Sequence, residues 1–127
     1  MDFNSLQGKT LVAVTGCYKN SDEIRFITID GDCYRLFHRQ SCCEDVRVED
    51  VVGNPEDLIG SPVLRAEERS NDVQVCEDGY SEEQWTFYTI ATIKGTVDLR
   101  WYGTSNGWYS TDVAFELLEL DHDTNAD

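Results

Sequence analysis

Short runs of apolar and β-branched residues, separated by turn residues, recur along most of the chain. The first apolar run covers residues 11–14, and two longer runs at 23–29 and 33–38 flank the dipeptide Asp30-Gly31. An Asp-Gly pair between two such runs is a strong short-range signal for a β-hairpin. The first third of the chain is therefore predicted to form strands, with a hairpin that turns at this dipeptide.

A two-residue turn at this dipeptide sets the register of the hairpin. It places Phe26 opposite Arg35 and Ile27 opposite Tyr34, so both faces of the ribbon carry large apolar side chains. Strands that are apolar on both faces are typical of sheets covered on both sides. We expect this ribbon to be at least partly covered on both faces.

The clearest alternation lies in the last third of the chain, where residues 85–93 and 96–102 flank Lys94-Gly95. A two-residue turn at this dipeptide brings one strongly apolar set of side chains onto a single face of the hairpin, with Tyr88 opposite Trp101. The set comprises Tyr88, Ile90, Thr92, Val97, Leu99 and Trp101. This face is predicted to be the core side of the sheet.

A third apolar run, residues 110–118, is predicted to lie beside this hairpin. Its alternate apolar side chains reach the core face only if the connection before it contains an odd number of residues. A plain two-residue turn would instead place Asp112 and Glu116 on that face, and burial of unpaired carboxylates is costly. We therefore predict a three- or five-residue loop, or a bulge, around residues 105–108.

Between these hairpins the pattern is less regular. Residues 46–51 alternate like a strand, and residues 63–69 are compatible with another strand. A single helical turn is predicted over residues 55–59, with Asn54 as the N-cap and proline at the first position. The polar stretch 70–83 is predicted to be an exposed, mobile loop.

These elements predict an all-β fold of about seven or eight mainly antiparallel strands, arranged as a sandwich or a half-open barrel. Residues 1–120 are expected to form one β domain with at most one short helical turn, because 127 residues are enough for a single core. Residues 121–127 are expected to be a flexible acidic tail.

Acidic residues dominate the charge, and they are concentrated in the middle of the chain. Twenty-five Asp and Glu against ten Lys and Arg give a net charge of −15, of which −10 falls between residues 41 and 83. This charge argues against direct binding of nucleic acid or anionic membrane, since both need a basic surface. Neither a run of about 18 apolar residues nor a signal-peptide pattern is visible, so we expect a soluble protein of the cytoplasm.

Five cysteines without an export signal favour reduced thiols over a disulfide framework. The densest chemistry is the set His38, Cys42, Cys43 and Glu44, which are ligand types that zinc binds. Their spacing is poor, because adjacent cysteines rarely ligate one tetrahedral ion together. Alternatively, the two cysteines straddle the start of a strand, one buried and one exposed, or they form a vicinal disulfide. Neither a catalytic group nor a cofactor is predicted.

Aromatic residues gather in the last third of the chain, with Trp85, Phe87, Tyr102 and Trp108 as the main members. The predicted register places Phe87 opposite Tyr102, near Arg100, on the face away from the core. Either a second layer covers this face, or it is an exposed aromatic patch suited to a protein interface or a stacked ligand.

Seven segments of the chain stand in a specific order and spacing. They are CCE at 42–44, VEDV at 48–51, DLIGSP at 57–62, AEE at 66–68, WTFY at 85–88, ATIKG at 91–95 and RWYGTSNGWYS at 100–110. In these segments the chain resembles a family of small uncharacterised proteins encoded by tailed bacteriophages and some bacteria, catalogued as a domain of unknown function. The resemblance covers about residues 8 to 117. It implies a phage or prophage origin and activity in the host cytoplasm, and it carries over no catalytic or binding residues.

The charge and the resemblance lead to a first hypothesis, a non-enzymatic phage accessory protein that binds and inhibits or redirects a host protein. A folded array of carboxylates could occupy a basic groove built for nucleic acid. The candidate carboxylates are Glu67, Glu68, Glu77, Asp78, Glu82 and Glu83. The alternative interpretation is that the net charge serves solubility.

Two further hypotheses use other residues. A small-ligand binder that sequesters a signalling nucleotide needs cations beside aromatic rings. The candidates are Arg25, Arg35, Arg39 and Arg100 with Trp85, Phe87 and Tyr102. A metal-binding protein would use the set around His38 described above.

Overall fold

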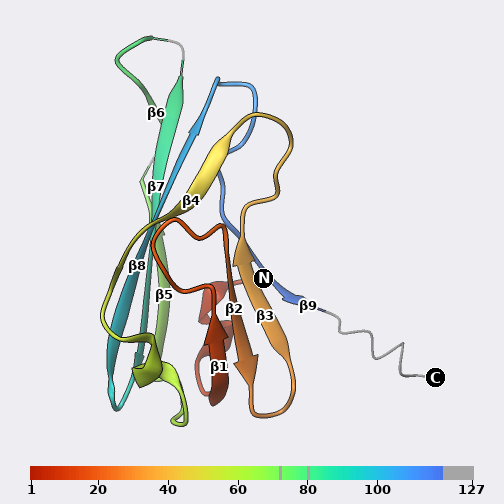
Figure 1. Cartoon of the computed structure of the whole chain (residues 1–127), viewed down its shortest axis with the longest axis vertical. Helices are drawn as coiled ribbons and strands as arrows, with labels where there is room; N and C mark the ends of the chain where they lie inside the picture. Colours follow the sequence, from red (N-terminus) through yellow and green to blue (C-terminus); the bar gives the residue numbers. More distant parts are fainter. Residues whose placement is uncertain (72, 80, 119–127) are drawn as a thin grey trace, which may run out of the picture.

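Two antiparallel β-sheets lie face to face in this computed structural model, which describes residues 1–71, 73–79 and 81–118 (Figure 1). The strands are β1 (Leu11–Thr15), β2 (Glu23–Thr28), β3 (Cys33–Phe37), β4 (Asp45–Val52), β5 (Arg65–Ser70), β6 (Gln74–Val75), β7 (Glu82–Thr92), β8 (Gly95–Ser105) and β9 (Ala114–Leu118). Two single turns of 3-10 helix are η1 (Phe3–Leu6) and η2 (Pro55–Leu58). The predicted all-β class is confirmed, in the form of a sandwich. The predicted acidic tail, residues 121–127, lies outside the described residues.

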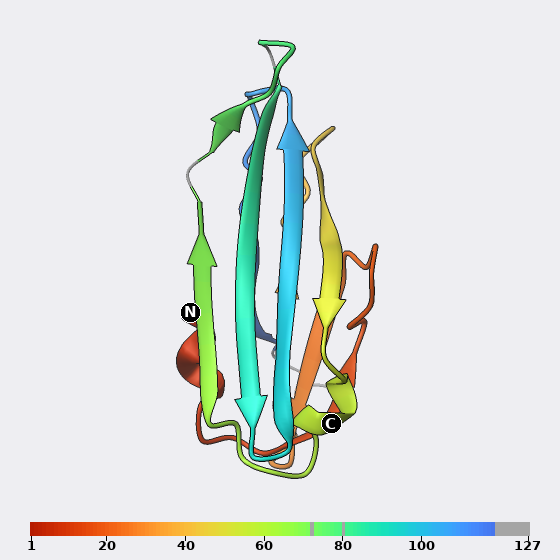
Figure 2. The same ribbon diagram turned by 90° about the vertical axis from the view of Figure 1, so that its left-hand side faces the viewer.

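One sheet has the strand order β1-β2-β3-β9, and the other has the order β4-β8-β7-β5 with β6 also paired to β7. The chain therefore leaves the four-stranded path after β3, builds the five-stranded sheet from β4 to β8, and returns with β9. Figure 2 shows the five-stranded sheet from its outer side, and no other described sheet or helix covers its middle. Its inner face packs on the other sheet.

Aromatic rings fill the space between the two sheets. Trp101 and Tyr88 of the five-stranded sheet are 0% and 1% exposed, and Phe26 and Phe115 of the four-stranded sheet are 0% and 7% exposed. The ring of Phe3, in η1, lies 4.7 Å from that of Tyr88 and 5.1 Å from that of Phe115, so η1 closes the core between the sheets. The predicted core face of the C-terminal hairpin is confirmed.

The hairpin of β2 and β3 has a three-residue loop, residues 29–31, where a two-residue turn was predicted. Gly31 has a φ of 93°, the left-handed conformation that such a loop needs and that glycine adopts without strain. Phe26 consequently pairs with Tyr34 and not with Arg35, and the other predicted pair shifts in the same way. The predicted register is wrong by one residue.

The hairpin of β7 and β8 turns at residues 93 and 94, one residue earlier than predicted. Tyr88 therefore pairs with Leu99, a shift of two residues that leaves each side chain on its predicted face. Gly95 is the first residue of β8 and lies outside the turn. A side chain at this position would clash with η2, because its Cβ would lie 2.7 Å from Oδ2 of Asp57. The close packing of η2 therefore accounts for the glycine at this position.

The last strand, β9, pairs with β3 of the other sheet, so its predicted place beside the C-terminal hairpin is wrong. Residues 106–113 cross from one sheet to the other instead of turning back beside β8. The reason is that β8 is a central strand with β4 on one side and β7 on the other, which leaves it no free edge. Phe115 still faces the core and Glu116 still faces away from it, as the alternation predicts.

The middle of the chain follows the prediction more closely. Oδ1 of Asn54 accepts a hydrogen bond from the amide of Glu56 at 3.0 Å, which confirms the predicted cap of η2. The predicted strands at 46–51 and 63–69 correspond to β4 and β5, whereas the predicted loop 70–83 contains β6 and the start of β7. No helix in the described ranges has the length and apolar character to cross a membrane.

Candidate functional site

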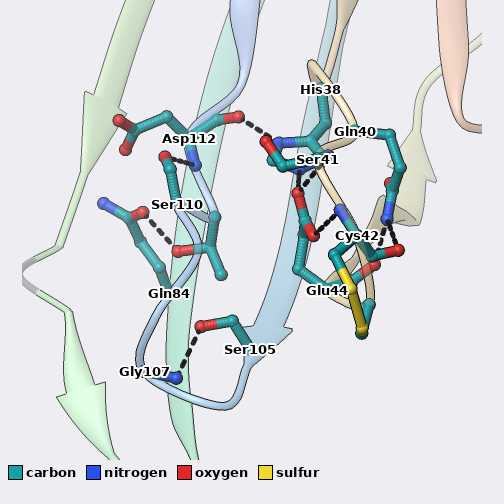
Figure 3. Close-up of polar contacts among 12 residues, drawn as sticks. His38, Gln40, Ser41, Cys42, Glu44, Gln84, Ser105, Gly107, Ser110 and Asp112 are labelled. Carbon is teal, nitrogen blue, oxygen red and sulfur yellow. Dashed lines mark hydrogen bonds and ion pairs between the residues drawn. A yellow bond between two sulfur atoms is a disulfide. The ribbon is translucent and has the colours of Figure 1, made fainter.

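A buried polar cluster lies where the two connections between the sheets meet (Figure 3). Its centre is His38, directly after β3, whose side chain is 4% exposed. Nε2 of His38 lies 2.8 Å from Oε2 of Glu44, just before β4, and Nδ1 lies 2.7 Å from the carbonyl oxygen of Asp112, just before β9. The cluster therefore joins the crossing from β3 to β4 to the crossing from β8 to β9, and we call these three residues the joint.

Glu44 is the most strongly bonded member of the joint. Its buried side chain also accepts hydrogen bonds from the amides of Ser41, at 2.8 Å, and Cys42, at 2.9 Å. Burial raises the pKa of Glu44, but the hydrogen bonds from His38 and from these amides outweigh it and lower the pKa to about 2. Glu44 is therefore an ionised carboxylate that acts only as an acceptor.

Both ring nitrogens of His38 face oxygen acceptors, the carboxylate of Glu44 and the carbonyl group of Asp112. An imidazole ring can hold both positions through its two nitrogens. Neither nitrogen is left to take a proton from a substrate, because both are engaged within the protein. The joint thus has the geometry of a structural tie and not that of a general base.

Cys42 and Cys43 are both exposed and are bonded to each other in a disulfide. The predicted arrangement with one buried and one exposed cysteine is wrong, because both residues lie in the exposed loop before β4. The predicted reduced state of this pair is also wrong, and the alternative of a vicinal disulfide is confirmed. Cys17, Cys33 and Cys76 carry free thiols. Within the part of the chain that the structure describes, no three His, Cys, Asp or Glu side chains are grouped so that they could hold a metal ion.

The predicted acidic residues lie along one edge and one end of the five-stranded sheet. They follow β5, the turn after β6 and the start of β7, and comprise Glu67, Glu68, Glu77, Asp78, Glu82 and Glu83. Some of these carboxylates already have partners. Glu67 accepts a hydrogen bond from Arg65 at 3.0 Å, and Glu83 accepts one from the hydroxyl group of Tyr102 at 2.9 Å.

The outer face of the five-stranded sheet carries half-buried aromatic side chains that no second described layer covers (Figure 2). Trp85 pairs with Tyr102, and their ring centroids are 4.4 Å apart. Phe87 pairs with Arg100, which corrects the predicted pair of Phe87 and Tyr102. Trp108 lies in the connection before β9 and is 85% exposed.

Charged groups surround these rings. The guanidinium group of Arg100 lies 5.6 Å from the ring centroid of Trp85, 2.6 Å from Glu49 and 3.8 Å from Asp50. A shallow pocket of about 140 Å³ lies beside Phe87, and Asp50 and Arg100 contribute to its wall. The face thus combines aromatic rings with a local excess of carboxylates.

The other predicted cations do not reach these rings. Arg25, Arg35 and Arg39 belong to the four-stranded sheet and its following loop, where Arg35 and Arg39 lie over the ring of Phe37. The sequence reasoning missed Phe37 as the aromatic partner. Had the loop between β2 and β3 been predicted with three residues, the predicted register would have placed Arg25 opposite Arg35.

Comparison with known proteins is informative about the family alone. A family model described as a domain of unknown function (DUF7448) matches residues 4–115. No curated protein and no solved structure matches the chain.

Proposed function

We propose that this chain, which belongs to the DUF7448 family, is a non-enzymatic accessory protein of phage or prophage origin that binds and inhibits a host protein. The single observation that carries the proposal is the uncovered outer face of the five-stranded sheet, where Trp85 and Tyr102 pack against each other beside a carboxylate-rich edge. We call this outer face together with its β5 edge the acidic face. The partner is a host protein with a basic groove, and the place of action is the host cytoplasm.

The composition of the acidic face supports a protein partner. Protein interfaces have a centre enriched in Trp and Tyr and a polar rim around it. Here Trp85 and Tyr102 supply the centre, and the carboxylates of β5 and of the start of β7 supply the rim. The pocket beside Phe87 holds about 140 Å³, whereas small-molecule sites hold about 300 Å³ or more. It is therefore closer in size to one side chain of a partner than to a nucleotide.

The charge of the acidic face supports mimicry of nucleic acid. A protein groove that binds phosphates presents lysine and arginine side chains, and a rigid array of carboxylates can pair with the same groups. A net charge of −15 also steers association with a basic partner at low salt. The sheet holds the carboxylates at fixed spacing, so little conformational entropy is lost on binding.

The first experiment identifies the partner and measures how binding depends on salt. Tagged protein captures candidates from a bacterial host lysate at two salt concentrations, and each purified candidate is then titrated. Between about 50 mM and about 500 mM salt we expect the dissociation constant to rise by about tenfold or more, since exposed charges are screened. An affinity independent of salt would contradict the electrostatic part of the proposal.

Matched variants then locate the binding surface. The test variant removes three carboxylates of the acidic face through Glu67→Gln, Glu77→Gln and Glu83→Gln, because Glu67 and Glu83 alternate onto the same side of the sheet as Trp85. The control removes three exposed carboxylates from the β2–β3 turn and η2, at the end of the sandwich away from β6 (Figure 1), through Asp30→Asn, Asp32→Asn and Glu56→Gln. We expect the test variant and Trp85→Ala each to weaken binding by about tenfold and the control to have little effect. Equal losses in both triple variants would mean that total charge, and not this face, drives binding.

A further inference from the structure

Three arginines lie together on the outer face of the four-stranded sheet. Arg25 on β2 lies directly opposite Arg35 on β3, and Arg39 follows two residues after β3. Like charges opposite each other destabilise a sheet, so this pairing has to be compensated. A chain with a net charge of −15 thus places three of its seven arginines at one site.

Two glutamates link these arginines into one row of charges. Glu23 lies 2.5 Å from Arg25 and 3.5 Å from Arg35. Glu116 lies 2.8 Å from Arg35 and also bonds to Arg39. These five residues carry one excess positive charge, and Asp22 lies beside them at the wall of the adjoining cavity. We call these five residues the arginine cluster.

Phe37 fixes the orientation of two of the guanidinium groups. The central carbon of the Arg35 guanidinium lies 3.7 Å from the ring centroid, and that of Arg39 lies 5.1 Å from it. Stacking on a ring leaves the N–H donors at the edge of the guanidinium plane available. Nε of Arg35 is buried and has no hydrogen-bond partner among the described residues, whereas its two terminal nitrogens face Glu23 and Glu116. The Arg39 side chain is 66% exposed, so Arg39 is the member of the cluster that is open to a ligand.

Two cavities meet at Arg39. One has a volume of about 460 Å³ and includes Arg35, Phe37 and Gln40 in its wall. The other has a volume of about 330 Å³ and includes Ser110. Both lie in the range of about 300 to 1,000 Å³ that is typical of small-molecule sites. The arginine cluster therefore has the space for a ligand that the pocket beside Phe87 lacks.

We propose that the arginine cluster binds a phosphate ester of nucleotide size. The edge of a guanidinium group matches two phosphate oxygens, and a phosphate group supplies the negative charge that the cluster lacks. The exposed plane of Arg39 can stack against a planar base. The net charge of the protein does not prevent this, because charges beyond about 10 Å are largely screened at about 0.1 M salt.

The test compares three probes by calorimetric titration and by NMR shifts of residues 35–40. They are a nucleoside monophosphate, the matching nucleoside without phosphate, and inorganic phosphate. We expect the nucleoside monophosphate to bind and the nucleoside not to bind. Equal binding of the nucleoside would overturn the role of the phosphate, and equal binding of inorganic phosphate would overturn the nucleotide-sized ligand. Absence of binding for every probe at about 10 mM would overturn the proposal as a whole.

A pair of variants ties the binding to the cluster. Arg39→Gln removes an exposed cation and leaves Glu116 paired with Arg35, so the fold is expected to persist. Its control is Arg47→Gln, which removes another half-exposed arginine paired with a carboxylate, at 2.8 Å from Asp45 on the other sheet. Arg39→Gln should weaken binding of the nucleoside monophosphate by about tenfold or more, and the control should not. Equal affinities for both variants would overturn the assignment. Because Arg39 lies outside the acidic face, its replacement should leave binding of a host protein unchanged.

Discussion

The outer faces of the two sheets carry aromatic rings in opposite electrostatic surroundings. On the five-stranded sheet Arg69 lies over Phe87 and Arg100 lies over Trp85. Three carboxylates beside them leave one excess negative charge, and they are Glu49, Asp50 and Asp98. On the four-stranded sheet three arginines share Glu23 and Glu116 around Phe37, which leaves one excess positive charge. One acidic protein therefore presents one face suited to a basic protein and another suited to a small anion.

This contrast follows from strand pairing and not from net charge. Across β4 and β8, Arg100 pairs with Asp50, so an arginine meets a carboxylate. Across β2 and β3, Arg25 pairs with Arg35, so an arginine meets an arginine. Net charge describes the whole chain, whereas the register of each strand pair decides which charges become neighbours.

The largest effect is expected from His38→Ala, because the joint holds the connections of both sheets in place. Removing His38 deprives the buried carboxylate of Glu44 of one hydrogen-bond partner, and such a loss costs about 1–3 kcal/mol of the free energy of unfolding. Urea unfolding followed by tryptophan fluorescence measures this loss. The control is Arg47→Ala, which breaks an exposed ion pair and should cost about 1 kcal/mol or less. Similar losses for the two variants would contradict the role of the joint.

The joint also predicts how stability depends on pH. The pKa of Glu44 is lowered from 4.5 to about 2 in the folded protein, so folding favours its ionised form. The stability that Glu44 contributes is therefore fully present above about pH 4.5 and is lost as the pH falls towards 2. In urea unfolding over this range, Glu44→Gln should start less stable than the natural protein and lose less stability on acidification. Parallel pH profiles would show that Glu44 does not cause the acid loss.

A smaller loss of stability should distinguish the charged groups on the outer faces of the two sheets. Glu23→Gln leaves Arg25 and Arg35 opposite each other without the carboxylate between them, and should cost about 1 kcal/mol at low salt. The loss should shrink as salt is added. Glu67→Gln on the acidic face breaks an exposed pair with Arg65 and should cost about 0.5 kcal/mol or less. Urea unfolding at two salt concentrations measures both, and a loss at Glu23 that does not depend on salt would point to packing in place of charge.

The smallest effect is expected at Trp108, which is 85% exposed. Trp108→Ala should change the free energy of unfolding by no more than about 0.5 kcal/mol. Trp85→Ala removes a ring that packs at a tilt against Tyr102 and should cost about 1 kcal/mol more. Urea unfolding of the two variants compares their losses of stability. A loss at Trp108 as large as that at Trp85 would mean that the packed aromatic side chains of the acidic face continue into the connection before β9.

Much of the fold was predictable because alternation of apolar and polar residues is local. The predicted strands at 23–29, 33–38 and 46–51 agree with β2, β3 and β4 within two residues at each end. The core face of the C-terminal hairpin was predictable as well, since an error of one residue in its turn shifts the partner of Tyr88 by two residues and leaves its face unchanged. The aromatic rings of the acidic face follow from the same pattern.

The candidate sites were predictable only in part. The set around His38 stood out in the sequence by its chemistry, but its role depends on Asp112, which lies 74 positions further along the chain. The arginine cluster depends on a one-residue difference in the β2–β3 loop and on Glu116 from a strand that was predicted to lie in the other sheet. Neither relation is a property of a local segment.

Residue types and their near neighbours are enough to set the β class, the strand positions, the core face and the uneven distribution of carboxylates. The pairing of β9 with β3, the tie between the two crossings at the joint and the gathering of three arginines on one face depend on how the strands assemble. The physical reason is that a strand pairs with whichever edge the other strands leave free, and β8 has none left for β9. That choice belongs to the assembled sheets, and it brings the side chains of the joint and of the arginine cluster together.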